Sequence, residues 1–247
     1  MTETSTIIIW VTLTFFAAGI VKGVIGMGLP TVAMGLLSLT MAPAAAAAAL
    51  VVPSLVTNVW QYLAGPSTRA ITRRLFVLLI AVCIGTFSGI AMLTTHAVAA
   101  SAALGVMLAI YGALGLAAPR FNVPARAEPY ASPIVGLATG LITGASGIFV
   151  IPAVPYLNSL GFTKDELIQA LGLSFTVSTV ALGLALAWRG QYSLSAAGAS
   201  LLAVVPAVAG MLLGQYVRGR LQADVFRRWF FISLIALGVY MAGRALI

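Results

Sequence analysis

Eight apolar runs, each about long enough to cross the hydrocarbon core of a bilayer, dominate this chain of 247 residues. A transmembrane helix needs about 20 consecutive apolar residues. Charged residues make up 7% of the chain, against roughly 25% in a soluble domain. The sequence therefore predicts an all-α polytopic membrane protein. The predicted segments are 6–40, 43–64, 75–93, 97–118, 133–162, 165–188, 195–217 and 229–247.

The first and fifth segments are too long for one crossing, and both are interrupted by glycine and proline, which break helices. The interruptions are Gly23, Gly26, Gly28 and Pro30 in the first segment, and Gly140, Gly144, Gly147, Pro152 and Pro155 in the fifth. If each break starts a short second arm, the chain makes ten passes. If each segment is one tilted helix, the chain makes eight.

The basic residues distinguish these alternatives, because Lys and Arg are enriched in cytoplasmic loops. With ten passes and an external N-terminus, ten basic residues are cytoplasmic, and only Arg189 and Arg244 are external. The ten are Arg69, Arg73, Arg74, Arg120, Arg126, Lys164, Arg218, Arg220, Arg227 and Arg228. With eight passes the split is seven against five, so ten passes are favoured. The arms 29–42 and 151–162 are short, however, and could be re-entrant hairpins.

The two broken segments also match each other when the chain is shifted by 121 positions. Between positions 19 and 59 the identities number 10 in 41, where so biased a composition gives roughly four by chance. A proline-rich stretch separates the halves. We therefore expect a first transmembrane repeat at 1–118, a cytoplasmic linker at 119–132 and a second repeat at 133–247. An odd number of passes in each half would make these inverted-topology repeats, as in many secondary transporters.

Composition limits the chemistry and the partners that we expect. The net charge of +8 comes from short clusters between apolar runs, so it reports topology and predicts no nucleic-acid partner. A single cysteine, Cys83, and a single histidine, His96, predict no metal site and no cofactor. The expected partners are the lipid bilayer and a small anionic substrate. The oligomeric state is left open, with a homodimer as one option.

Lys22 is the only charge well inside an apolar segment. Burying a cation there costs about 2.5–3.5 kcal/mol, so it needs a partner or a purpose. It shares a helix face with Gly19 and Gly26. One interpretation is that Lys22 snorkels to the interface and that the glycines serve close helix packing. The other is an anion site built at the two glycine breaks, with Thr143 as the neutral counterpart in the second half.

Polar residues on the neighbouring segments favour the second interpretation. Ser54, Asn58 and Gln61 form a stripe along one helix face, and Ser174 and Ser178 lie in the corresponding segment of the second half. Interhelical hydrogen bonds explain single serines, but Asn58 and Gln61 are costlier to bury. The predicted substrate site comprises Lys22, Gly23, Gly26, Gly28, Ser54, Asn58, Gln61, Thr143, Gly144, Ser146, Gly147, Ser174 and Ser178.

Gly144 to Gly147 also resemble the G-x-S-G motif of rhomboid intramembrane proteases. Such a serine needs a base within hydrogen-bond reach. No histidine follows Ser146 in the sequence, and His96 is expected in an exposed external loop. The sequence therefore predicts no catalytic residues, and an intramembrane serine protease remains only a remote alternative.

Three stretches together resemble the TauE/SafE family of membrane proteins: AGIVKGVIGMGLPTVAMGLLSL, GLATGLITGASGIFVIPAVPYLNSLG and WRGQYS. The similarity covers nearly the whole chain. It implies a multi-pass carrier of the bacterial inner membrane that exports sulfite, organosulfonates or other small sulfur-containing anions. The second stretch departs from the more glycine-rich family form at Ile148 and Phe149, which leaves the substrate open.

From these observations we expect an uncoupled, potential-driven exporter that works by alternating access. The membrane potential alone favours the exit of an anion, and the chain lacks the intramembrane carboxylates that proton-coupled carriers use. An anion channel, or a carrier of a non-sulfur solute, is the alternative that the same residues allow.

Overall fold

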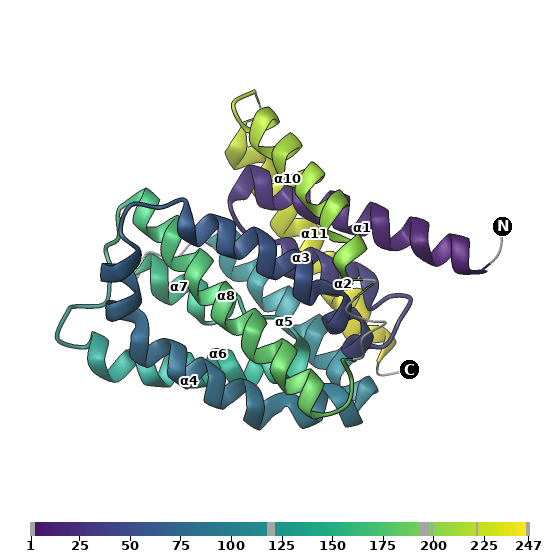
Figure 1. Ribbon diagram of the computed structural model, residues 1–247, viewed down its shortest axis with the longest axis horizontal. Helices are drawn as coiled ribbons and strands as arrows, with labels where there is room; N and C mark the ends of the chain where they lie inside the picture. The colour runs from purple at the N-terminus through teal and green to yellow at the C-terminus, as the bar shows by residue number, and fades with distance from the viewer. Residues whose placement is uncertain (1–2, 118–121, 193–197, 199, 221, 246–247) are drawn as a thin grey trace.

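The computed structural model describes residues 3–117, 122–192, 198, 200–220 and 222–245, and their regular structure is helical (Figure 1). The helices are α1 (Glu3–Ile25), α2 (Leu29–Leu37), α3 (Pro43–Leu63), α4 (Thr68–Thr95), α5 (Ala97–Ala117), α6 (Glu128–Ser146), α7 (Ala153–Asn158), α8 (Lys164–Trp188), α10 (Val204–Arg218) and α11 (Ala223–Arg244). The predicted all-α fold is confirmed for this part of the chain.

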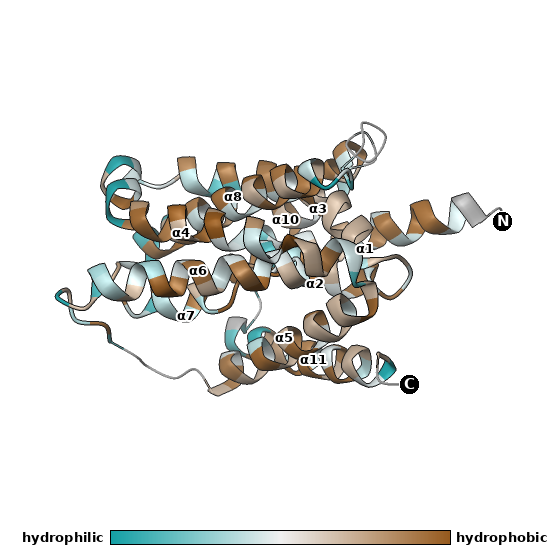
Figure 2. Cartoon of the chain, turned by 90° about the horizontal axis from the view of Figure 1, so that it is seen from below, coloured by the Kyte–Doolittle hydropathy of each residue, from teal (hydrophilic) through white to brown (hydrophobic). Residues whose placement is uncertain are grey.

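Seven of these helices are long and apolar enough to cross a membrane. Figure 2 shows hydrophobic residues along the helix shafts, while hydrophilic residues gather at helix ends and turns. Many large apolar side chains face outwards, among them Ile84, Leu184 and Trp229. Water would make so much exposed apolar surface costly, whereas lipid would cover it. The protein is therefore a multi-pass membrane protein.

Both predicted breaks are present, and glycine makes them. Gly26 and Gly28, between α1 and α2, have φ angles of 85° and 105°. Gly147, which ends α6, has a φ of 75°. A Cβ atom would strain the backbone at these angles, so glycine is the residue that lets the helix end there.

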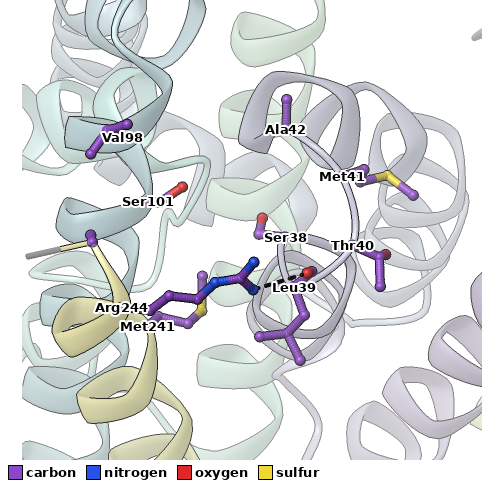
Figure 3. A pocket seen from close by; sticks show the side chains of 10 residues that line it. Ser38, Leu39, Thr40, Met41, Ala42, Val98, Ser101, Met241 and Arg244 are labelled. Carbon is purple, nitrogen blue, oxygen red and sulfur yellow. Dashed lines mark hydrogen bonds between the residues drawn. The ribbon is translucent and has the colours of Figure 1, made fainter. Parts of the chain in front are cut away.

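Each break reverses the direction of the chain. The α2 helix starts at Gly28 beside Phe230, near the start of α11. It ends close to the last turn of α11, where the Leu39 carbonyl accepts a hydrogen bond from Arg244 (Figure 3). In the second half, the Tyr156 hydroxyl of α7 lies 2.7 Å from the Ser132 hydroxyl, near the start of α6. Each short helix thus runs back along its half of the bundle.

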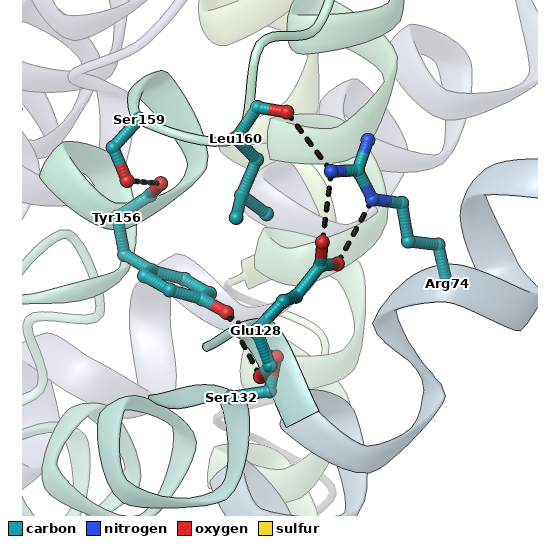
Figure 4. Close-up of polar contacts among 6 residues, drawn as sticks. All are labelled: Arg74, Glu128, Ser132, Tyr156, Ser159 and Leu160. Carbon is teal, nitrogen blue, oxygen red and sulfur yellow. Dashed lines mark hydrogen bonds and ion pairs between the residues drawn. The ribbon is translucent and has the colours of Figure 1, made fainter. Parts of the chain in front are cut away.

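A polar network ties three turns together at one end of the bundle (Figure 4). Arg74 of α4 forms a salt bridge of 2.9 Å with Glu128 of α6. The same guanidinium donates to the Leu160 carbonyl and lies 4.5 Å from the centre of the Phe162 ring. If segment 133–162 crossed once as a tilted helix, Arg74 and Phe162 would lie at opposite ends. Segment 133–162 is therefore not a single tilted helix.

Helix directions assign the other basic residues to two ends. We call the end with Arg74 the basic end and the end with Arg244 the opposite end. Arg189 also lies at the opposite end, where its Nε donates to the Thr94 hydroxyl. The described basic residues at the basic end are Arg69, Arg73, Arg74, Arg126, Lys164, Arg218, Arg220, Arg227 and Arg228. Arg120 lies outside the described residues.

Glycines allow two helix pairs to pack backbone against backbone. On α1, a Cβ atom at Gly23 would lie 2.2 Å from the Met211 carbonyl oxygen of α10. On α6, a Cβ at Gly144 would lie 2.4 Å from the Thr86 carbonyl oxygen of α4. The order of the contacts along both pairs shows that α1 runs parallel to α10, and α4 parallel to α6. Close helix packing is therefore the observed role of these glycines.

The other two major pairs are antiparallel: α3 with α8, and α5 with α11. The α3–α8 pair forms the centre of the bundle. In the apolar windows of α3 and α8, 61% and 72% of the residues are buried, against 28–39% in the other five long helices. A polar group on these two helices is thus the most shielded from the surroundings.

Two helices begin earlier than the apolar runs indicate. The α4 helix begins at Thr68 instead of position 75, and α6 begins at Glu128 instead of 133. Hydropathy detects the membrane core, whereas a helix can extend into the polar interface. Pro129 is in the first turn of α6, where a missing backbone N–H costs nothing. The last residues of the predicted linker, 128–132, are therefore helical. The start of the predicted segment 195–217 lies partly outside the described residues.

Gly140→Ala should destabilise the protein. The new Cβ would lie 2.2 Å from the Val82 carbonyl oxygen, and overpacking of this kind costs about 1–3 kcal/mol. Gly243→Ala is the matched control, because its Cβ meets nothing within 4 Å. Thermal unfolding in detergent measures both variants. A midpoint for Gly140→Ala as high as that for Gly243→Ala would contradict the close α4–α6 contact.

Candidate functional site

Lys22 lies in the last turn of α1 and is 3% exposed. Its ammonium group donates a hydrogen bond to Oδ1 of Asn58 on α3. All five acidic residues of the chain lie in the first turn of a helix: Glu3, Glu128, Asp165, Glu166 and Asp224. The partner of Lys22 is therefore a neutral amide, and its positive charge is not balanced by a carboxylate deep in the bundle.

Asn58 has unused hydrogen-bonding capacity. Its side chain is fully buried, and its Nδ2 has no partner among the described residues. One turn earlier on α3, the fully buried Ser54 hydroxyl also lacks a partner there. An unpaired buried polar group costs about 1–3 kcal/mol. Such groups are therefore expected where a ligand supplies the missing bond.

The central partner of α3 carries two more hydroxyls of this kind. Ser174 and Ser178 lie one turn apart on α8, and neither buried hydroxyl has a hydrogen-bond partner among the described residues. Other buried hydroxyls in the same helices satisfy themselves. Thr57 donates to Pro53 O at 2.9 Å, and Thr179 donates to Phe175 O at 2.7 Å. Ser54, Ser174 and Ser178 thus differ from ordinary helix hydroxyls.

Together these residues offer hydrogen-bond donors and one positive charge. Lys22 supplies an ammonium group, Asn58 an amide N–H, and the three serines supply hydroxyls. An anion accepts bonds from all three kinds of donor, and bonds to a charged group are the strongest ones. The arrangement suits a small anion in the shielded centre of the bundle and offers little to a cation.

The other predicted site residues have local structural roles. Gly23 and Gly144 mediate helix packing, while Gly26, Gly28 and Gly147 form the breaks. A direct role of these five glycines in substrate binding stays a prediction.

Three predicted polar residues have hydrogen-bond partners. Gln61 donates from Nε2 to the Ile168 carbonyl at 2.8 Å and so ties α3 to α8 near the basic end. Thr143 donates to Thr139 O, and Ser146 donates to Ile142 O. These bonds explain how each side chain is tolerated in an apolar bundle. Substrate contacts by these three residues remain predictions that the geometry does not favour.

Sequence reasoning missed Thr31, which is fully buried in the first turn of α2. Its hydroxyl also lacks a partner among the described residues. Thr31 directly follows Pro30 in an apolar run, and it belongs to no periodic polar stripe. The proximity of Pro30 to the break was the only signal that could have drawn attention to it.

The protease alternative has no support in the geometry. The Ser146 hydroxyl donates to the Ile142 carbonyl and accepts from the Ile148 N–H at 3.3 Å, as a helix-ending serine does. His96 is exposed at the C-cap of α4, at the opposite end of the bundle. A serine nucleophile needs an adjacent base, and neither bond of Ser146 involves one.

A multi-pass helical bundle with a buried, donor-rich polar centre is compatible with a membrane transport protein. Comparison with known proteins identifies the family. The model of the sulfite exporter TauE/SafE family matches residues 11–241, and the chain belongs to this family. Members of the family are membrane transporters of sulfite and related sulfur anions, not enzymes. No curated protein and no solved structure matches the chain.

Ser178→Ala should leave the stability of the substrate-free protein unchanged or raise it, because the lost hydroxyl has no partner. Ser146→Ala makes the same chemical change at an equally buried position but removes two hydrogen bonds. It should cost about 0.5–1.5 kcal/mol for a typical bond. Thermal unfolding of both variants without substrate tests this difference. A clear loss of stability in Ser178→Ala would show that its hydroxyl is used within the protein.

Proposed function

We propose that the protein is a secondary transporter of the bacterial inner membrane that exports small sulfur-containing anions, such as sulfite or an organosulfonate. The observation that carries the proposal is the buried Lys22–Asn58 pair, together with buried hydroxyls on α3 and α8 that have no partner among the described residues. Family membership supports the sulfur anion. The basic end would then face the cytoplasm, as the enrichment of Lys and Arg in cytoplasmic loops requires.

The helix pairs support an inverted repeat. A shift of 121 positions relates α1 to α6 and α10 to α4, so the parallel pairs α1–α10 and α6–α4 correspond to each other. The helices α1 and α10 run toward the basic end, whereas α4 and α6 run toward the opposite end. The same shift relates α3 to α8 and α5 to α11, and each of these antiparallel pairs therefore joins an element to its own counterpart. Such pairing is what a two-fold axis in the membrane plane produces.

Inverted repeats allow alternating access around a central site. The candidate site lies on α1, α3 and α8, and its residues are at most 3% exposed. The described conformation therefore matches an occluded state, which opens to either side when one half moves against the other. The two glycine breaks are the proposed hinge positions, because glycine restricts the backbone angles least.

The membrane potential is sufficient to drive this export. Moving one elementary charge across 100 mV is worth about 2.3 kcal/mol, which corresponds to roughly a fifty-fold concentration ratio. The interior of the cell is negative, so this free energy favours the outward movement of an anion. No acidic residue lies deep in the described bundle to act as a proton relay, which agrees with uncoupled transport.

The flux should depend on the membrane potential. In proteoliposomes with the protein in inverted orientation, uptake of labelled sulfite should approach a limit of about fifty-fold accumulation per 100 mV for a monovalent anion. The same vesicles clamped at zero potential are the control. Preloaded unlabelled sulfite should accelerate exchange, as it does for a carrier. A flux indifferent to potential would contradict uncoupled export, and the absence of counterflow would indicate a channel.

Lys22→Met should weaken the binding of sulfite by about ten- to a hundred-fold, because a hydrogen bond to a charged group contributes about 1.5–3 kcal/mol. Lys164→Met is the matched control, since it removes the same charge from an exposed helix start. Isothermal titration calorimetry in detergent measures both affinities. Equal affinity of the two variants would show that Lys22 takes no part in anion recognition.

A further inference from the structure

A pocket of about 650 Å³ opens at the opposite end of the bundle. Figure 3 shows the side chains that line it. The loop after α2, the start of α5 and the end of α11 form its walls. Arg244 is one of its lining residues. This arginine is one of the two exceptions to the concentration of basic residues at the basic end. A cation on the external side runs against the usual distribution of Lys and Arg, so its position calls for a reason.

The guanidinium of Arg244 has few partners in the described part of the chain. Its only hydrogen bond to a described residue is a long one of 3.4 Å to the neutral Leu39 carbonyl. Among the described residues the one salt bridge is Arg74–Glu128, at the other end. Four of the five donors of a guanidinium therefore have no partner in the described part of the chain.

Hydroxyl groups supplement this charge. Ser38 and Ser101 line the same pocket and come from two further elements, the C-cap of α2 and helix α5. The Ser38 hydroxyl is buried and has no partner among the described residues. Figure 3 places Ser38, Ser101 and the Arg244 guanidinium around one space. A guanidinium beside two hydroxyls is a donor set for an oxyanion.

The path of the chain links this pocket to the central site. The α2 helix begins at Leu29, just after the Gly26–Gly28 break and seven residues after Lys22. It ends at its C-cap Ser38, in the pocket. We propose that the pocket is a second oxyanion site, a release vestibule that receives the exported anion from the central site. The assignment of this end to the exterior rests on the proposed function. Binding itself does not.

The size of the pocket predicts weak binding. A small oxyanion fills a minor part of 650 Å³, so it keeps much of its water and exchanges quickly. The central site, in contrast, is closed to solvent. Weak, rapidly exchanging binding suits release, because an anion held tightly at the exit would slow the export cycle.

The number of bound anions tests the proposal. Equilibrium dialysis of the purified full chain against labelled sulfite should show two sites per chain, one tight and one weak. Arg244→Gln should lose the weak site and keep the tight one. Arg189→Gln should keep both, because it removes the other arginine of the same end, which contacts Thr94 and does not line the pocket. Ser38→Ala should reduce the affinity of the weak site. It replaces Arg244→Gln as the test variant if Arg244→Gln does not fold.

Two sites in Arg244→Gln with unchanged affinities would overturn the proposal, as would a single site in the unmodified protein. Lys22→Met separates the two hypotheses, because it should weaken binding at the tight site only. If Lys22→Met loses nothing while Arg244→Gln loses the weak site, the central site fails and the pocket stands. A further experiment repeats the equilibrium dialysis in micelles that contain phosphatidylglycerol. Competition by this lipid for the weak site would identify a lipid phosphate as the occupant and overturn a release vestibule.

Discussion

The hydrocarbon core of a bilayer offers no hydrogen bonds, so every interruption of a helix must be covered by protein. This requirement governs the architecture of the bundle. The breaks at Gly26–Gly28 and Gly147 free backbone groups deep in the chain, and both are packed against other helices. Gly28 lies against Phe230 of α11, and Gly147 lies against Met34 of α2. Each half thus covers the break of the other half, so the fold needs both halves at once.

Close packing of the two halves depends on glycine. The α1–α10 and α4–α6 pairs each join one half to the other, and their backbones approach closely because Gly23 and Gly144 lack a side chain. No hydrophobic effect drives helices together within lipid, so this close contact supplies much of the association. It brings the end of α1 near α3, where Lys22 reaches Asn58. The α1 helix thus carries both the glycine contacts with α10 and the cation of the polar centre.

The sequence predicted the breaks because glycine and proline interrupt segments that are too long for one crossing. It predicted the central cation because a charged residue is unusual within an apolar run. It also predicted Ser54, Asn58, Ser174 and Ser178 from their spacing on helix faces. It could not separate them from Ser146 or Thr143, because the difference lies in hydrogen bonding. Thr143 satisfies its hydroxyl one turn back, whereas Ser178 does not. Spacing also could not find Thr31 or the pocket at Arg244, whose walls come from distant segments.

The proposed central site does not follow the proposed repeat of the chain. The counterpart of Lys22 under the 121-residue shift is Thr143, a neutral residue that already bonds to its own helix. The counterpart of Asn58 is Thr179, which is also satisfied locally. All the charge of the site therefore comes from the first half, through one helix, α1. A symmetric pair of cations would repel each other and hold an anion too strongly to release it. In the proposed mechanism, one cation, held by a neutral amide, attracts an anion and lets it leave when one half moves against the other.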